Sequence, residues 1–403
     1  MTQWSADTVF VVFGDDWGRR VSSMQHVFRH IVPNHRVVWV NGIGHRLPTL
    51  HLSDVRRAMH KGLAMVRRAR RVEGGSDDGP QPAEIVEPRV LPWHHLSPVR
   101  AMNTRTLTRA IRAALGRVAP GAAPVLVTGS PPSVGVIGQL GELASIYFCM
   151  DDFVHLEGVT GWMLEPLERR LLERVDAVVA TAEELVRVKR PVSGRSFYLP
   201  QGVNYDHFAT PRAIPADLAA LPGPRIGFAG GISSCVELDL LGQLATAFPD
   251  GSVVLVGPAT VDLSPLGAYP NIHVLGRREY SDLPAYVQHF DVGTIPYILN
   301  DWTRSVDPLK LLEYLAAGLP VVSTDLPEVR KYADVVDVQP TAAGFVHAVR
   351  QALASGAEAV ARRQALAARH TWGARAEEFM SMVQGVLARP TASAVGGAGV
   401  RSA

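Results

Sequence analysis

Short apolar runs rich in β-branched residues alternate along the chain with stretches in which apolar residues recur at helical spacing. Most runs are continuous, which is typical of strands that helices cover on both faces. Helices between such strands indicate βαβ units and parallel sheets. In the first half we expect strands at 9–13, 37–40, 125–128, 146–150, 177–181 and 197–199. In the second half we expect them at 226–229, 253–256, 272–275, 292–295, 321–323 and, more weakly, 335–338.

A chain of 403 residues exceeds one ordinary hydrophobic core, so its length favours two domains. Residues 209–225 are rich in proline and alanine without a strand pattern, which indicates a joint between two similar halves. Open α/β sheets bind ligands beyond the carboxyl ends of their strands, so we expect a cleft with a site on each side. We predict an α/β protein with two Rossmann-like parallel-sheet domains, 1–207 and 208–372, then a helix 373–388 that returns to the first domain and a disordered tail 389–403.

Residues 53–71 depart from this alternation. Their apolar positions Val55, Met59, Leu63 and Val66 recur at helical spacing, while arginine and lysine cover the remaining faces. Such a basic amphipathic helix suits an anionic membrane surface. A solvated helix whose apolar stripe packs on its own domain explains the pattern equally well.

Composition limits the function classes. The chain is 47% hydrophobic and 19% charged, as a globular protein should be, and its net charge of +2 gives no indication of a nucleic-acid partner. Two cysteines make no disulfide framework, which favours a reducing compartment. The N-terminal residues lack a basic region followed by a long apolar one, so we expect no signal peptide. We find no stretch of about 20 apolar residues, and no metal, hydrolase or triphosphatase motif.

The stretch 305–324 combines helix punctuation with two charges. Asp307 suits an N-cap and Pro308 the first helical position, while Gly318 suits the position after the helix. A short buried strand follows. Lys310 and Glu313 lie three residues apart, so they share a face of this helix.

These two charges fit a ribose and a diphosphate. A carboxylate at Glu313 could accept hydrogen bonds from both ribose hydroxyls, and an ammonium at Lys310 could neutralise a diphosphate. The alternative is a surface ion pair worth a few tenths of a kcal/mol. Because the surrounding "LLEYLAAG" is largely apolar, we expect Glu313 at a half-buried edge, where a charge needs a partner. This favours the functional interpretation.

Glycines follow the first strand of the second half in "GFAGGISS", residues 227–234. Gly230 and Gly231 would let backbone N–H groups approach a phosphate at the start of a helix. Alone this is a weak signal, because most glycine pairs form ordinary turns, and the sequence does not match the dinucleotide fingerprint G-x-G-x-x-G.

Carboxylates also follow two strands of the first half. Asp151 and Asp152 come after 146–150, where a carboxylate could act as general base on an acceptor hydroxyl. Capping of the next turn is the alternative for one of the pair. Asp16 and Trp17 follow the first strand and would line the acceptor side, although capping and packing explain them better than catalysis.

Several of these stretches resemble one family. "DPLKLLEYLAAGLPVVSTDLPEV" resembles the donor-site signature of bacterial GT-B glycosyltransferases, above all the teichuronic-acid-type and xanthan glucuronosyltransferase-like enzymes. "YFCMDDF" resembles a strand end of theirs, and "LPQGVNYDHF" resembles the segment that crosses between their domains. The resemblance covers most of residues 9–387.

The resemblance implies site residues. Glu313 would hold the ribose of a nucleotide sugar and Lys310 its diphosphate, while Gly230 and Gly231 would admit the phosphates. The loop 276–283 would frame the base. Asp151, with Asp152 second, would be the base of an inverting mechanism.

The chain departs from the family pattern in two places. Retaining relatives carry a second glutamate where this chain has Ser305, and a basic pair in the glycine loop where it has none. Arg277 or Arg304 could supply the missing positive charge. The stereochemical outcome and the donor therefore stay open.

The resemblance implies a cytoplasmic glycosyltransferase, peripheral on the inner face of the membrane. It would move a sugar from a nucleoside diphosphate donor, UDP-linked in the first instance, to a lipid-linked glycan or another cell-envelope or exopolysaccharide acceptor. No metal or other cofactor and no nucleic acid are expected. A nucleotide-sugar 2-epimerase of the same architecture and a non-catalytic scaffold of a polysaccharide assembly complex are the alternatives.

Overall fold

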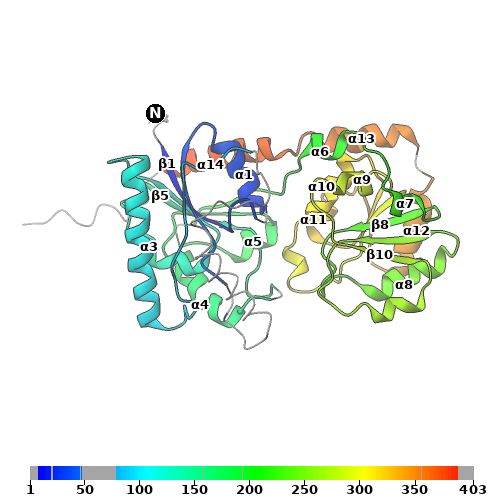
Figure 1. The fold of residues 1–403 in the computed structure, drawn as a ribbon, viewed down its shortest axis with the longest axis horizontal. Coiled ribbons are helices and arrows are strands. Elements are labelled where there is room, and N and C mark those ends of the chain that lie inside the picture. The colour runs from blue at the N-terminus through cyan, green and yellow to red at the C-terminus, as the bar shows by residue number, and fades with distance from the viewer. Residues whose placement is uncertain are drawn as a thin grey trace, which may run out of the picture. The chain divides into compact units, whose positions relative to one another are not determined.

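The computed structural model describes residues 8–19, 21–45, 47, 79–156, 158–192, 194–354 and 356–388. The chain divides into two compact units (Figure 1). Unit 1 comprises Met1–Val179, Lys189–Phe197 and Phe379–Ala403, and unit 2 comprises Ala180–Val188 and Tyr198–Glu378. The predicted basic helix 53–71 and the predicted tail 389–403 lie outside the described residues.

The first sheet has seven strands in the order β3-β2-β1-β4-β5-β6-β7. The pairs β1–β2, β1–β4, β2–β3 and β4–β5 are parallel. All five residues of β1 are buried, so helices cover both faces of the central strand. The strands are β1 Val9–Phe13, β2 Arg36–Val40, β3 Glu84–Val86, β4 Val125–Thr128, β5 Ala144–Cys149, β6 Ala177–Ala180 and β7 Ser196–Tyr198.

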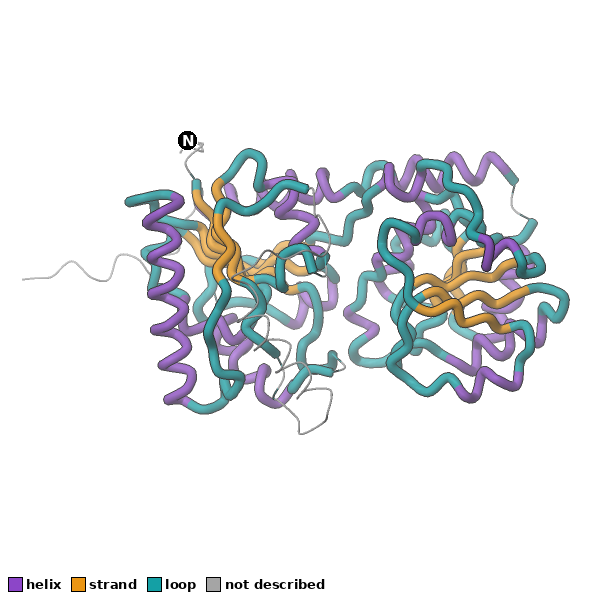
Figure 2. The backbone as a smooth tube through the Cα atoms, in the orientation of Figure 1, coloured by secondary structure: helices purple, strands orange, loops and turns teal. Residues whose placement is uncertain are grey.

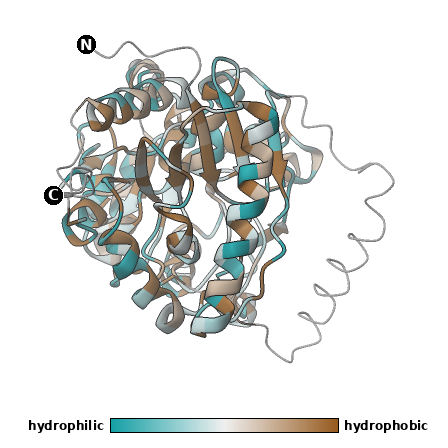
Figure 3. Ribbon diagram, turned by 90° about the vertical axis from the view of Figure 1, so that its left-hand side faces the viewer, coloured by the Kyte–Doolittle hydropathy of each residue, from teal (hydrophilic) through white to brown (hydrophobic). Residues whose placement is uncertain are grey.

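The helices of this part of the chain are α1 Ser23–Ile31, α3 Ser97–Val118, η1 Pro131–Val136, α4 Gly161–Leu172 and α5 Glu183–Val188. Helix α14, Trp372–Leu387, begins in unit 2 and continues into unit 1 from Phe379. Phe28 of α1 lies 5.8 Å from Phe10 of β1 and 5.7 Å from Phe379 between ring centroids, so α1 and α14 share one face of the sheet. Figure 3 shows the strands mostly in hydrophobic brown, whereas the helices mix brown and teal.

The second sheet has six strands in the order β10-β9-β8-β11-β12-β13, all parallel. Figure 2 shows the strands of the chain as two separate groups of orange tube, one in each unit. The order reverses at β8 and β11, which are neighbours. The strands are β8 Arg225–Ala229, β9 Ser252–Val256, β10 Ile272–Gly276, β11 Val292–Ile295, β12 Val321–Thr324 and β13 Asp337–Gln339.

The helices of unit 2 cover this sheet, and one continuous apolar core fills the unit. They are α6 Tyr205–Ala209, α7 Ala216–Ala219, α8 Leu238–Ala247, η2 Ser264–Ala268, α9 Leu283–Val287, η3 Thr303–Ser305, α10 Leu309–Ala316, α11 Pro327–Arg330, α12 Ala342–Ala352 and α13 Ala357–Ala367. Among the helices of the described ranges, none combines the length and the apolar character that crossing a bilayer requires.

The predicted fold class is confirmed, and each predicted strand overlaps an observed one. The sequence analysis missed β3, which has three residues and pairs at the sheet edge with β2 alone. The predicted capping of α10 is wrong in part. Pro308 is the N-cap, and the Asp307 carboxylate instead accepts the Gln201 N–H at 2.9 Å. Gly318 does end the helix, with φ +82°.

Candidate functional site

The candidate donor site of unit 2 lies where its strand order reverses. Strands β8 and β11 are adjacent, but their continuations lead to opposite edges of the sheet. In open α/β sheets such a switch point is where ligands bind, beyond the carboxyl ends of the strands. Gly230 follows β8 directly, Tyr297 follows β11 after one proline, and Lys310 reaches this point from α10.

The backbone at Gly230 requires a glycine. Its φ is +150°, and its N–H donates to the Val256 carbonyl at 2.8 Å. A Cβ at Gly230 would lie 2.9 Å from Lys310 Cε and 3.2 Å from its Nζ. Gly257 after β9 is equally constrained, because its Cβ would lie 1.9 Å from the Gly230 carbonyl oxygen. The structure therefore brings the glycine turn and Lys310 together, as the predicted site requires.

Lys310 is a buried cation, 9% exposed, that aromatic groups surround. Its ammonium donates a short hydrogen bond to the Tyr297 hydroxyl. It also lies 4.5 Å from the centroid of the Tyr297 ring and 4.9 Å from that of Phe228. Within the described ranges it forms no ion pair with a carboxylate. The charge of Lys310 is thus held by π faces and one phenol, and no anion of the described residues neutralises it.

Tyr314 fixes the end of β8. The Ala229 N–H donates to the Tyr314 hydroxyl at 2.7 Å, and both residues are buried. The ring fits because β11 has a glycine beside it. A Cβ on Gly293 would lie 2.6 Å from the ring. This contact holds the strand end that leads into Gly230.

Glu313 lies three residues after Lys310 on α10 and is half-buried. Burial raises the pKa of its carboxyl to about 7, and the charge of Lys310 counteracts this in part. No described residue forms a hydrogen bond or an ion pair with this carboxylate. The alternative of a surface ion pair between Lys310 and Glu313 is therefore wrong, since neither side chain is exposed and the two are not in salt-bridge contact.

The other predicted donor residues lie in more open positions. Gly231 is exposed, with no atom within 4 Å of a built Cβ. Arg277 follows β10. Among the described residues its ion pair is a loose one with Glu279, at 3.8 Å, and both side chains are mostly exposed. Arg304 lies in η3 and is exposed. In the described structure neither arginine forms a hydrogen bond or an ion pair with Lys310 or Glu313.

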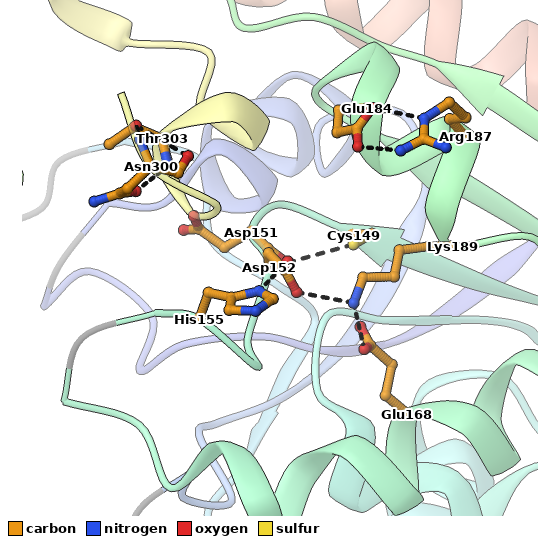
Figure 4. A network of polar contacts seen from close by, with 10 residues as sticks. All are labelled: Cys149, Asp151, Asp152, His155, Glu168, Glu184, Arg187, Lys189, Asn300 and Thr303. Carbon is orange, nitrogen blue, oxygen red and sulfur yellow. Dashed lines mark hydrogen bonds and ion pairs between the residues drawn. The ribbon is translucent and has the colours of Figure 1, made fainter. Parts of the chain in front are cut away.

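Asp152 of unit 1 belongs to a buried charge network at the end of β5 (Figure 4). Its carboxylate accepts from Lys189 Nζ at 2.9 Å and from His155 Nδ1 at 2.7 Å. Lys189 also donates to Glu168 at 2.7 Å, and Glu168 accepts the Tyr147 hydroxyl at 2.6 Å. These hydrogen bonds lower the pKa of Asp152 against the effect of its burial. A carboxylate so well paired is a poor base.

Asp151 has a different environment from its neighbour. It is half-buried, and its carbonyl oxygen lies 3.5 Å from Cys149 Sγ. In Figure 4 its carboxylate points away from the network of Asp152, Lys189 and Glu168. The carboxylates of the two predicted bases therefore point in different directions.

Asp16 and Trp17 stabilise the loop after β1. The Asp16 carboxylate accepts the Gly42 N–H at 3.2 Å, and the Trp17 N–H donates to Asn41 Oδ1 at 3.0 Å. The Trp17 ring lies 4.7 Å from Trp39. These contacts agree with the capping and packing that we favoured for both residues.

The sequence analysis missed two polar residues at the carboxyl edge of the first sheet. His45 Nε2 lies 2.8 Å from Ser130 Oγ, and the His45 ring packs at 5.0 Å from Phe153. Burial lowers the pKa of His45 to about 4, so the imidazole is neutral near pH 7. Ser130 follows β4 after one glycine. No motif marked either residue, because only the strand order places them together.

The sequence analysis also missed Tyr297 and Phe228 in unit 2. The signal that could have found Tyr297 is its place just beyond a predicted strand. Among the described residues, no group of three or more histidine, cysteine, aspartate or glutamate side chains is placed to hold a metal ion.

Residues 224–362 match the family model described as glycosyl transferases group 1. This chain has the GT-B fold, and the match to group 1 glycosyltransferases lies within unit 2. A curated relative from Bacillus subtilis (strain 168), named as a teichuronic acid biosynthesis glycosyltransferase, TuaH, is 31% identical over 180 residues. That match covers 42% of this chain and 45% of the relative, so it spans less than half of the relative's length.

Solved structures of the same fold cover nearly the whole chain. HepE of Anabaena, in complex with UDP and glucose, matches with a TM-score of 0.62 and 12% identity, over 94% of this chain and 100% of HepE. A structure described as trehalose-6-phosphate from E. coli bound with UDP-2-fluoro glucose matches with a TM-score of 0.61 and 12% identity, over 95% and 100%. At this identity the likeness shows the fold alone. The predicted GT-B fold is confirmed.

Proposed function

We propose that this GT-B protein transfers a sugar from a nucleoside diphosphate donor to a hydroxyl group of an acceptor. The observation that carries the proposal is the buried Lys310 ammonium, which lies against Gly230 without a carboxylate partner in the described structure. A buried cation of this kind is stabilised by an anion, and a diphosphate at the switch point would supply one. The HepE structure holds UDP and the E. coli structure holds a UDP sugar, which supports a UDP sugar as the first donor to test.

The remaining donor contacts follow from the positions of the side chains. Glu313, one turn beyond Lys310, would accept hydrogen bonds from the ribose hydroxyls. Gly230 and Gly231 would let phosphate oxygens approach the backbone, and exposed Arg277 and Arg304 would add positive charge. A diphosphate leaving group needs such charge when the bond to the sugar breaks.

Unit 1 would bind the acceptor. We assign the general base to Asp151, because the carboxylate of Asp152 is bound by Lys189 and His155. As base, Asp151 would accept the proton of the attacking hydroxyl in an inverting reaction. The acceptor class, a lipid-linked glycan of the cell envelope or an exopolysaccharide, rests on the similarity to TuaH over less than half of its length.

The proposed site of action is the cytoplasmic side of the membrane. Cys149 and Cys235 are both free and buried, which agrees with a reducing compartment. Peripheral binding to an anionic surface rests on residues 53–71, which lie outside the described residues. Vesicle flotation with and without anionic lipid, on the full chain and on a variant with the arginines of 53–71 replaced, would test it.

The donor site is tested by isothermal titration of UDP and GDP into the wild type, Glu313→Ala and Lys310→Ala. We expect both variants to bind the preferred nucleotide at least about tenfold more weakly, because each loses a charged hydrogen bond. Unchanged binding in both would refute the donor site. Incubation with a nucleotide sugar alone separates the alternatives, since an epimerase would convert it without an acceptor and a scaffold would not consume it under any condition.

A further inference from the structure

The Tyr297 hydroxyl accepts a hydrogen bond from a buried ammonium, that of Lys310. A phenol offers one O–H donor and two acceptor lone pairs. The Lys310 ammonium occupies an acceptor position of this oxygen. Tyr297 must therefore point its own proton elsewhere, and no described residue accepts it. Tyr297 is only 8% exposed, so this donor is held in a largely buried place rather than in bulk water.

The backbone around Tyr297 fixes where that donor lies. The Tyr297 N–H donates to Thr324 Oγ1 at 3.1 Å, and the Thr324 hydroxyl donates back to the Tyr297 carbonyl at 2.7 Å. These bonds connect the end of β11 to the end of β12. The ring also packs at 6.3 Å from Phe228 of β8. The phenol is thus preorganised beside the glycine turn by three neighbouring strands.

Donation by an ammonium strengthens the phenol as a donor. Hydrogen bonds in a chain polarise one another, and they do so more where water is excluded. A phenol that accepts from a cation carries a more positive hydroxyl hydrogen, which suits an anionic acceptor. Lys310 and Tyr297 together therefore present one charge and one polarised O–H at the carboxyl edge of the sheet.

We propose that Tyr297 is a second leaving-group residue, which donates a hydrogen bond to a phosphate oxygen while Lys310 supplies the charge. The inference rests on the proposed transfer reaction. In that reaction the bond between the anomeric carbon and the diphosphate oxygen breaks, and both electrons leave on the oxygen. The acceptor oxygen forms the new bond and loses its proton to Asp151. The Tyr297 hydroxyl keeps its own proton and stabilises the charge that builds on the diphosphate.

The test is the substitution Tyr297→Phe, which keeps the ring over Lys310 and removes only the hydroxyl. Titration of UDP should show an affinity lower by about 10- to 100-fold, the effect of a hydrogen bond to a charged group. The affinity for uridine, followed by ligand-observed NMR, should stay unchanged, because uridine has no phosphate. Donor turnover should fall in kcat as well, since charge on the leaving group grows in the transition state.

The matched control is Tyr198→Phe. Tyr198 is also a phenol of unit 2 that accepts a hydrogen bond from a lysine, Lys331 at 2.8 Å, and it donates to Glu328 at 2.7 Å. This variant should lose stability but keep the wild-type affinity for UDP and uridine. If Tyr297→Phe weakens UDP and uridine equally, the phenol only supports the local fold and the inference is wrong.

Two further outcomes separate the inference from the proposed function. If the wild type binds neither UDP nor GDP, both fail. If Lys310→Ala weakens UDP binding and Tyr297→Phe does not, the proposed role of Tyr297 is wrong and the proposed donor site stands. NMR of the wild type, with its tyrosines labelled with 13C at the hydroxyl-bearing carbon, gives a check that does not depend on a variant folding. A tyrosine resonance should shift with UDP and not with uridine, and no such shift would overturn the inference.

Discussion

Two buried lysines, one in each unit, differ in how their charge is satisfied. Lys189 of unit 1 is 8% exposed and donates to two carboxylates, Asp152 at 2.9 Å and Glu168 at 2.7 Å. Lys310 of unit 2 is 9% exposed and donates to a phenol between two aromatic rings. The two carboxylates raise the pKa of Lys189 above its usual range despite the opposing effect of burial.

The difference indicates that the charge of Lys189 has a structural role, whereas the charge of Lys310 is available to bind an anion. Lys189 is neutralised inside its own unit, so an added anion would compete with two carboxylates. Lys310 has paid the desolvation penalty without gaining an anionic partner among the described residues. Both lysines have acids nearby in the sequence, Lys189 after Glu183 and Glu184 and Lys310 before Glu313, but the spacing does not show which lysine is neutralised by a carboxylate.

The largest effect should come from Lys189→Met. The substitution leaves Asp152 and Glu168 buried without their cation, so the free energy of unfolding should fall by about 3–5 kcal/mol. Urea unfolding at pH 7.5 measures it. The loss should shrink at pH 5, where unpaired buried carboxyls take up protons. The exposed pair of Arg187 and Glu184 is the control, and Arg187→Met should change stability far less than Lys189→Met, because water screens a surface ion pair.

Glu313→Gln tests whether Glu313 acts as the counter-ion of Lys310. The folded pKa of Glu313 is raised from 4.5 to about 7, so the folded state binds the proton more tightly than the unfolded chain. The stability that this provides is complete below pH 4.5 and is lost as the pH rises to 7.

The glutamine side chain of the Glu313→Gln variant does not titrate, so the variant does not lose this stability as the pH rises. Relative to the wild type it should therefore gain up to about 3 kcal/mol between pH 4.5 and pH 8, measured by urea unfolding without nucleotide. A salt bridge between Glu313 and Lys310 predicts the opposite sign, because the wild type would then gain stability over this range.

Lys310→Met should separate binding from stability. Lys310 has no carboxylate partner among the described residues, so the substitution leaves no buried anion unpaired. The free energy of unfolding should therefore change by about 1 kcal/mol or less. The affinity for UDP should fall by about 10- to 100-fold, since a charged hydrogen bond to phosphate is lost. Unfolding by urea and titration of UDP on the same preparation give both values. A stability loss as large as that of Lys189→Met would show that the two lysines do not differ.

The smallest effect should come from Gly230→Ala. The added methyl would meet Lys310 Cε at 2.9 Å, and the φ of +150° is unfavourable for alanine. We expect a loss of about 1 kcal/mol in stability and roughly tenfold in UDP affinity, because Lys310 must move. Gly267→Ala in η2 is the control, with open space around it and no positive φ. Equal UDP affinity in both variants would mean that the position of Lys310 does not matter for binding.

Much of the fold could be predicted because the signals are local. A strand covered on both faces must be apolar throughout, so β1, β4 and β11 are visible as continuous runs at their observed positions. Strand β3 gave no such signal. It has three residues, and its middle residue, Ile85, is 38% exposed at the sheet edge. Asp307 misled the prediction because an aspartate before a proline fits an N-cap, whereas here it accepts a hydrogen bond from Gln201.

The sequence by itself determined the two α/β units, the glycine after β8, and the helix that carries Lys310 and Glu313. Each depends on residues close together in the chain. Only the tertiary structure decided that Lys310 lies against Gly230 and Tyr297, and that Lys189 joins Asp152 and Glu168. The partners of a buried charge come from segments that packing brings together, and spacing along the chain does not record them. The same reason hid Tyr297, whose chemistry depends on a lysine from another element.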